Sequence, residues 1–348
     1  MNRSADAIRI AQPKPSKLPL LCILSLFALL ITGCPEQSFS IPERTAPTGW
    51  QVEKDIPDVS LGGLYFLDNQ RGWVTGNNGV ILHTEDGGQQ WKPQDTGIKG
   101  LIVSIFFVDA KTGWAVGDRG LILHTTDGGA SWRLQASGQK KDLTHVYFID
   151  SKQGWITGLK GILLFTKDAG QTWTEPKGET RTTLNAVLFT DPDHGWITGH
   201  QGTLLFTENG GRNWSRREIE TEDDLHRIFF LDSQTGWIVG NRGSIFKTTD
   251  AGLTWRKQES GVAAFLAGIY FTDARKGWAV GATGTVLHTQ DGGKSWVQQV
   301  TGTIQFLTAV HFMNQQLGLV TGTKGTLLRT ESGGIPPTPE TSPMETAS

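Results

Sequence analysis

Residues 72–91 read GWVTGNNGVILHTEDGGQQW, and residues 113–132 read GWAVGDRGLILHTTDGGASW. The two stretches are 41 residues apart, and the same spacing continues along the chain in two tryptophan series. The first series is Trp73, Trp114, Trp155, Trp196, Trp237 and Trp278, and the second is Trp91, Trp132, Trp173, Trp214, Trp255 and Trp296. A seventh, degenerate copy falls at Leu317-Gly318-Leu319. A period in the forties with several short strands per repeat predicts an all-β protein, a seven-bladed β-propeller of 41-residue repeats.

Each repeat reads as four short strands. The first strand is apolar on both sides, as in Leu64-Tyr65-Phe66, and this is typical of an innermost strand packed between neighbouring blades. An Asp turn leads to the Gly-Trp strand, and a Gly-x-x-Gly turn, Gly76 to Gly79, leads to the third strand. The fourth strand begins at the second-series tryptophan. Because consecutive strands run antiparallel, the Asp turn and the connection from the third to the fourth strand lie at one end of the blade. The Gly-x-x-Gly turn and the connection to the next repeat lie at the other end.

The ring requires a strand from the opposite end of the chain. The seventh repeat lacks its second-series tryptophan, because that position is occupied by Pro337. Trp50, however, stands 41 residues before Trp91. We therefore expect residues 50–53 to supply the fourth strand of the last blade, which joins the termini and removes two open sheet edges.

The two ends of the chain lie outside the repeats. Residues 1–17 are basic, and an apolar run, 18–33, is too short for a spanning helix of about 20 residues. The run ends in Ile31-Thr32-Gly33-Cys34, which resembles the lipoprotein cleavage box, and this resemblance implies a lipid on the Cys34 thiol. A simple secretory signal or a single-span anchor is the alternative. We predict a lipoprotein signal peptide over 1–33, an anchor linker over 34–49, the propeller over 50–334 and a disordered Pro/Thr/Ser-rich tail over 335–348.

Composition excludes several classes of function. The chain of 348 residues carries 32 Lys and Arg against 34 Asp and Glu, and this balance argues against a nucleic-acid binder. Its two cysteines, Cys22 and Cys34, both precede the propeller, which therefore has no disulfide, thiolate metal site or Cys nucleophile. The histidines form no cluster with ligand spacing, although His145 and His226 lie on innermost strands and could face the channel. We expect no metal and no cofactor.

The octet that ends each third strand, Thr84 to Trp91 in the first repeat, resembles the Asp-box or bacterial neuraminidase repeat. Its acid recurs at too many equivalent sites to be catalytic, so we interpret it as a turn whose carboxylate accepts amide hydrogens while the tryptophan packs back over the hairpin. Asp-boxes also occur in sialidase-like glycosidases, which need a Tyr nucleophile with a carboxylate base. Tyr65, Tyr147 and Tyr270 share one strand register with apolar residues and are expected in the core. We therefore assign no catalytic residue, while a carbohydrate-active propeller stays the alternative that activity on a panel of glycosides would detect.

The variable loops point to a binding face. We name as the link face the end of the ring with the Gly-x-x-Gly turns and the connections between repeats. Four of the seven equivalent turn positions there are cationic, and the neighbouring connections add Lys99, Lys140, Lys141, Lys177 and Arg181 before an acidic connection over 218–224. Charge of one sign gathered in one sector steers partners of opposite charge. The predicted protein-binding residues are Arg119, Lys140, Lys141, Lys160, Arg181, Arg242 and Lys324.

A lipid-box signal, a Trp-rich seven-bladed ring, Gly-Trp-x-x-Gly and Thr-x-Asp-Gly-Gly-x-x-Trp together resemble the photosystem II assembly and stability factor family, over about residues 50–334. The resemblance implies a non-enzymatic chaperone in the thylakoid lumen that helps assemble the reaction-centre core. We expect a monomeric, lipid-anchored scaffold of the cell envelope that faces the periplasm, or the lumen in a photosynthetic source. Its partner would be an acidic protein segment or a membrane-protein assembly intermediate.

Overall fold

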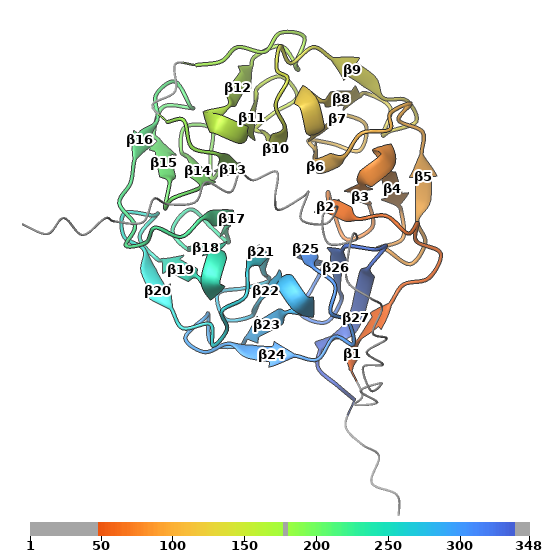
Figure 1. The fold of residues 1–348 in the computed structure, drawn as a ribbon, viewed down its shortest axis with the longest axis vertical. Coiled ribbons are helices and arrows are strands. Elements are labelled where there is room, and N and C mark those ends of the chain that lie inside the picture. The colour runs from red at the N-terminus through yellow and green to blue at the C-terminus, as the bar shows by residue number, and fades with distance from the viewer. Residues whose placement is uncertain (1–47, 177–179, 338–348) are drawn as a thin grey trace, which may run out of the picture. The chain divides into compact units, whose positions relative to one another are not determined.

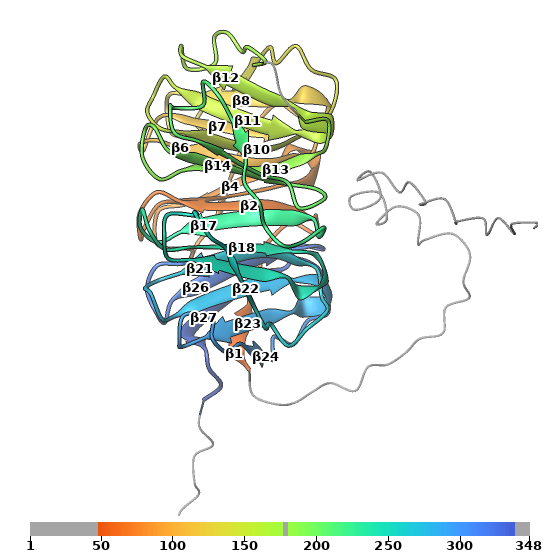
Figure 2. The same cartoon turned by 90° about the vertical axis from the view of Figure 1, so that its left-hand side faces the viewer.

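Seven antiparallel sheets are arranged in a ring around a central axis in the computed structural model, which describes residues 48–176 and 180–337 (Figure 1; Figure 2). Each sheet is one blade, and the blades follow one another around the ring in chain order. The predicted seven-bladed propeller is thereby confirmed. No helix in the described residues is long and apolar enough to cross a membrane.

The first four blades take up residues 61–216. Blade 1 consists of β2 (Leu61–Phe66), β3 (Gly72–Gly76), β4 (Ile81–Thr84) and β5 (Lys92–Gln94). Blade 2 consists of β6 (Ile102–Phe107), β7 (Gly113–Gly117), β8 (Ile122–Thr125) and β9 (Arg133–Gln135). Blade 3 consists of β10 (Leu143–Phe148), β11 (Gly154–Gly158) and β12 (Leu163–Thr166). Blade 4 consists of β13 (Leu184–Phe189), β14 (Gly195–Gly199), β15 (Leu204–Thr207) and β16 (Ser215–Arg216).

The other three blades include the only strand that is contributed from outside its own repeat among the described residues. Blade 5 consists of β17 (Leu225–Phe230), β18 (Gly236–Gly240), β19 (Ile245–Thr248) and β20 (Arg256–Gln258). Blade 6 consists of β21 (Leu266–Phe271), β22 (Gly277–Gly281), β23 (Val286–Thr289) and β24 (Val297–Gln299). Blade 7 consists of β25 (Leu307–Phe312), β26 (Gly318–Gly322), β27 (Leu327–Gly334) and β1 (Gly49–Val52). Single 3-10 turns follow the second strand of five blades: η1 (Asn77–Gly79), η2 (Asp118–Gly120), η3 (Leu159–Gly161), η4 (Asn241–Gly243) and η5 (Ala282–Gly284).

Blade 7 is closed by the N-terminal strand, as expected. Gln51 of β1 pairs with Arg329 and Val52 with Leu328 on β27. Trp50 is 5 % exposed, lies edge-on to Phe312 at a centroid distance of 6.0 Å, and donates its indole N–H to the Gln299 side chain at 3.1 Å. Trp132 of blade 2 makes the equivalent bond to Gln94 of blade 1 at 3.2 Å. Trp50 therefore takes the place of the missing second-series tryptophan.

The Gly-Trp tryptophans hold neighbouring blades together. All six are at most 2 % exposed, and each lies against the phenylalanine that ends the first strand of the next blade. Trp73, for instance, stacks on Phe107 at a centroid distance of 3.7 Å, and Trp155 stacks on Phe189 at 4.1 Å. The stacks bury a large aromatic surface at six of the seven junctions, and at the junction of blades 7 and 1 the equivalent position is Leu319, which packs in one cluster with Phe66.

The Asp-box turns have the expected structural role. In blade 1, Asp86 Oδ1 accepts the N–H groups of Gln89 and Gln90, each at 2.9 Å, and the Thr84 hydroxyl at 2.7 Å. The second-series tryptophans are half-buried, and each meets the phenylalanine of its own blade edge-on; the ring centroids of Trp173 and Phe148 lie 6.0 Å apart.

The expectation of four strands in every repeat is wrong for blade 3. Its outer segment is reduced to a single bridge between Phe165 and Thr174. The reason is Pro176, which stands where Gln94 pairs with Ile81 in blade 1. Proline has no N–H to donate to the ladder, so regular pairing cannot continue at this position.

Candidate functional site

The loops of each blade divide between two faces, as the sequence predicts. On the link face, the turn after the second strand is bonded to the connection that follows the same blade: Gly79 N donates to Gly100 O at 2.6 Å, and Gly243 N to Ala264 O at 2.7 Å. On the opposite face, which we name the Asp-turn face, the Asp-box is bonded to the Asp turn, as in Gly87 N to Gln70 O at 2.9 Å. The Asp-turn-face bond is found in all seven blades, and the link-face bond in blades 1, 4, 5, 6 and 7.

The cationic turn residues occupy a strained backbone position. Arg119, Lys160, Arg242 and Lys324 have φ values of 51°, 58°, 53° and 52° and are exposed. The left-handed region favours glycine or asparagine, so a long cationic side chain there is uncommon. The other three blades hold the same conformation with Asn78, Gln201 and Thr283. The turn therefore lifts a variable side chain into solvent at seven equivalent points of the link face.

Two adjacent blades bring their turn cations next to the cations of the connections. Arg119 N donates to Asp142 Oδ1 at 2.9 Å, which places this turn beside the exposed Lys140 and Lys141. In the next blade, Lys160 N lies 3.5 Å from the Thr183 hydroxyl, two residues beyond the exposed Arg181. We name these five cations of blades 2 and 3 the basic sector: Arg119, Lys140, Lys141, Lys160 and Arg181. Lys177, predicted to lie near them, falls outside the described residues.

The predicted cations differ in their counter-charges. Within the described residues, Lys140, Lys141, Lys160 and Arg181 form no ion pair, and Arg119 contacts only its neighbour Asp118 at 3.3 Å. Arg242 is different, because it forms an ion pair with the buried Asp223 of the acidic connection. Five cations against the neighbouring Asp118 and Asp142 leave an excess of positive charge over blades 2 and 3, while Arg242 is neutralised locally. Strand register alone places Arg242 with the other turn cations and does not reveal this pairing.

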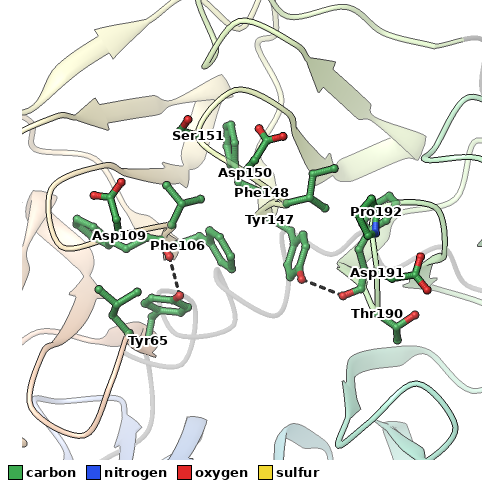
Figure 3. Close-up of a pocket in the computed structure, with 15 residues that line it drawn as sticks. Tyr65, Phe106, Asp109, Tyr147, Phe148, Asp150, Ser151, Thr190, Asp191 and Pro192 are labelled. Atoms are coloured by element: carbon green, nitrogen blue, oxygen red, sulfur yellow. Dashed lines mark hydrogen bonds between the residues drawn. The ribbon is translucent and has the colours of Figure 1, made fainter.

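The Asp-turn face contains a recess that the sequence pattern did not predict (Figure 3). The rim recess, of about 570 Å³, has Tyr65, Phe106 and Tyr147 in its wall and the turn residues Asp109, Asp150 and Asp191 around its edge. The signal that could have revealed it is the fifth residue of the first strand, which is aromatic in most repeats. The Asp turns do not reveal the recess, because a motif that is repeated in every blade does not indicate where a local hollow forms.

The tyrosines of the recess are committed to holding blades together. Tyr65 donates its hydroxyl to Phe107 O at 2.7 Å, and Tyr147 donates to Phe189 O at 2.9 Å. Burial raises the pKa of both phenols, that of Tyr65 being raised further by the nearby Tyr147. A phenol that stays protonated and hydrogen-bonded is a poor nucleophile. The arrangement therefore does not supply the Tyr nucleophile of a sialidase-like site.

The histidines of the innermost strands separate into two environments. His145 lines the central channel, as expected. His226 does not; it stacks on Phe265 at a centroid distance of 3.9 Å, and its Nε2 lies 2.8 Å from Asn241 Oδ1. The two differ because His226 is the second residue of its strand and His145 the third, and successive side chains point to opposite sides. No group of three His, Cys, Asp or Glu residues within the described ranges could hold a metal ion.

Comparison with solved structures shows a shared fold. The chain is similar to "YCF48 bound to D1 peptide", with 23 % identity, a TM-score of 0.69 and coverage of 82 % of this chain and 97 % of that one. YCF48 from Cyanidioschyzon merolae is 20 % identical, with a TM-score of 0.69 and coverage of 82 % of this chain and 99 % of that one. The GH74 xyloglucanase from Xanthomonas campestris is 13 % identical, with a TM-score of 0.68 and coverage of 82 % of this chain and 54 % of that one.

The sequence itself identifies the family. None of the curated proteins matches it. The family model of the photosynthesis system II assembly factor YCF48 matches residues 90–182, 176–260, 218–301 and 262–331. These overlapping segments cover well over half of the chain and carry the repeats described above, and they confirm the predicted resemblance. The chain therefore belongs to the family of the photosynthesis system II assembly factor YCF48.

Proposed function

We propose that this chain is a non-enzymatic, lipid-anchored assembly scaffold that binds an acidic segment of a protein partner through the basic sector of its link face. The observation that carries the proposal is the basic sector itself: five exposed cations on two adjacent blades, four of them without an ion pair among the described residues. An excess of exposed positive charge in one sector speeds association with a partner of opposite charge.

The family supports the choice of a protein as the partner. One solved YCF48 structure is described as bound to a D1 peptide, so a propeller of this family is able to hold a peptide. For this chain we infer the same class of ligand, a segment of a membrane-protein assembly intermediate. The position at which the D1 peptide binds in YCF48 is not carried over. The position in this chain is argued from its own cations. The scaffold would act as a monomer, without metal or cofactor.

Reversing three charges of the basic sector tests the proposal. We expect the combined variant Arg119→Glu, Lys160→Glu and Arg181→Glu to weaken capture of the partner and to flatten the salt dependence of binding, because the attraction to an acidic segment becomes repulsion. Glutamate meets the same backbone geometry as arginine and lysine at the two left-handed positions, so the melting temperature should be unchanged. The measurement is affinity capture from the native envelope at several salt concentrations.

A matched control reverses three exposed cations on the Asp-turn face: Lys111→Glu, Lys152→Glu and Arg275→Glu. The net charge changes by the same amount, so this variant should retain capture if the position of the cations matters. Capture of the partner by the basic-sector variant at low salt would show that the partner binds elsewhere. No hydrolysis of a glycoside panel is expected from the wild type, whereas turnover would favour the carbohydrate-active alternative.

The anchor is part of the same proposal and lies outside the described residues. It rests on the apolar run 18–33 and on Cys34 directly after it. The Cys34→Ser variant should abolish acylation and leave an uncleaved, membrane-held precursor, because both modification and cleavage require the thiol. Mass spectrometry and membrane partitioning of the variant check this prediction. A mature protein of unchanged mass and partitioning would exclude the lipid anchor, and with it the proposed membrane attachment in the periplasm or thylakoid lumen.

A further inference from the structure

The central channel contains a cavity of about 260 Å³ that belongs to neither face site. It is lined mainly by the third to fifth residues of the first strands, with only the fifth residue, Leu188, contributed by blade 4. The third and fifth side chains lie on the same side of a strand because side chains alternate. The third residues are small in five blades, namely Gly63, Ser104, Ala186, Gly268 and Ala309. The two exceptions are His145 of blade 3 and Arg227 of blade 5. The small third residues leave room for the cavity, and Arg227 is one of the residues that line it.

Arg227 lacks a partner for its charge. Within the described residues it forms no ion pair, no hydrogen bond is found for its guanidinium, and no Asp or Glu lines the cavity. Burial lowers the pKa of Arg227 to about 10, so the guanidinium stays charged at neutral pH. Arg227 is half-buried and faces the channel, and a charge beside apolar walls without a counter-charge attracts an anion.

Two further groups of the cavity are donors without an acceptor among the residues that the structure describes. Val187 N donates to His145 Nδ1 at 3.4 Å, so the neutral imidazole carries its proton on Nε2. Burial, and then the nearby charge of Arg227, holds the pKa of His145 well below its usual value. Val146 N donates to Ser104 Oγ at 3.3 Å, which leaves the Ser104 hydroxyl hydrogen free. The cavity thus combines a guanidinium, an imidazole N–H and a hydroxyl.

We propose that the central channel is a binding site for a small oxyanion of the carboxylate class, held by the fork of Arg227 with Ser104 and His145 as additional donors. A planar guanidinium suits the two oxygens of a carboxylate. The volume lies below the roughly 300–1,000 Å³ of pockets for drug-sized ligands, so the site holds a small anion or a single chain end. The site is separate from the basic sector, and the two proposals stand or fall independently.

The route to this site runs through the rim recess. Tyr65, Phe106 and Tyr147 line both the recess and the channel cavity, and they form part of an aromatic collar at the fifth strand position. The neighbouring rings of the collar lie 5.1 Å (Tyr65–Phe106) and 4.9 Å (Phe106–Tyr147) apart. A carboxylate entering from the Asp-turn face would therefore pass an apolar ring before it reaches Arg227.

Thermal shift and calorimetry of the full-length protein test the site. Sodium acetate should raise the melting temperature above that in sodium chloride of the same ionic strength, since a ligand of the native state stabilises it. In Arg227→Met the acetate affinity should fall by at least about tenfold, because a charged hydrogen-bonding partner is lost. This variant should fold, with a melting temperature in chloride equal to or above that of the wild type, because an unpaired cation is replaced by an apolar side chain. Arg119→Met is the matched control on the link face and should keep the acetate response.

Three probes distinguish the sources of the anion. Binding of an N-acetylated alanine peptide with a free carboxylate, but not of its C-terminal amide, would assign the site to a chain end. Binding of acetate or inorganic phosphate without either peptide would assign it to a free anion. The proposal is overturned if none of the probes binds the wild type, or if Arg227→Met and Arg227→Lys bind acetate as tightly as the wild type does. Arg227→Lys keeps the charge without the fork and provides this comparison even if the methionine variant fails to fold.

Discussion

Deletion of residues 44–58 is expected to open the ring and to lower the melting temperature by more than about 10 °C, with aggregation on heating. The deletion removes β1, which pairs with β27, and Trp50, whose ring covers Phe312. Loss of a buried tryptophan alone typically costs about 3–5 kcal/mol, and the deletion also exposes a strand edge. Differential scanning calorimetry of the purified variant is the measurement.

Deletion of residues 336–348 is the matched control at the other end of the chain. β27 ends at Gly334, so this deletion removes no strand and should leave the melting temperature unchanged. Equal tolerance of the two deletions would show that blade 7 does not depend on β1.

Truncation of a junction tryptophan is the second large effect. Trp155→Ala should lower the free energy of unfolding by about 3–5 kcal/mol, because the residue is fully buried and stacks on Phe189 of the next blade. Part of that loss could be absorbed by the neighbouring blades of a repeat ring. Chemical denaturation followed by fluorescence measures the change.

Trp173→Ala, in the same blade, provides the comparison. This half-buried Asp-box tryptophan touches Phe148 only edge-on, so we expect a smaller loss, about 1–2 kcal/mol. A greater loss for Trp173→Ala than for Trp155→Ala would mean that the edge-on contacts at the outer part of the blade, rather than the stacks between blades, hold the ring together.

Most of the fold could be predicted because the repeat period never changes. A constant 41-residue spacing fixes the strand register, and this spacing alone is enough to assign Trp50 to blade 7. The same register placed Arg119, Lys160, Arg242 and Lys324 at equivalent turn positions of one face. The loss of the fourth strand of blade 3 depended on a single proline, whose effect is local and easily overlooked in a pattern.

The sites were less predictable, since they depend on departures from the repeat. Arg227 and His145 share a strand position with small residues, and only the closed ring shows that this position faces a cavity. His226 stands one residue earlier than that position and consequently packs between blades. The pairing of Arg242 with Asp223 joins a turn of blade 5 to the connection before that blade, a contact that no local pattern encodes.

Site-directed crosslinking tests directly which face of the propeller contacts the partner. Both native cysteines, Cys22 and Cys34, precede the propeller. A single cysteine introduced into the propeller is therefore the only one in that domain and can carry a thiol-reactive photocrosslinker. The probe would be placed at Lys160→Cys in the basic sector or at Lys152→Cys on the Asp-turn face, with the unsubstituted chain as the background, in the native envelope. We predict that the partner crosslinks to the probe at position 160 and not to the probe at position 152. Crosslinking from position 152 alone would contradict the account and place the partner on the Asp-turn face.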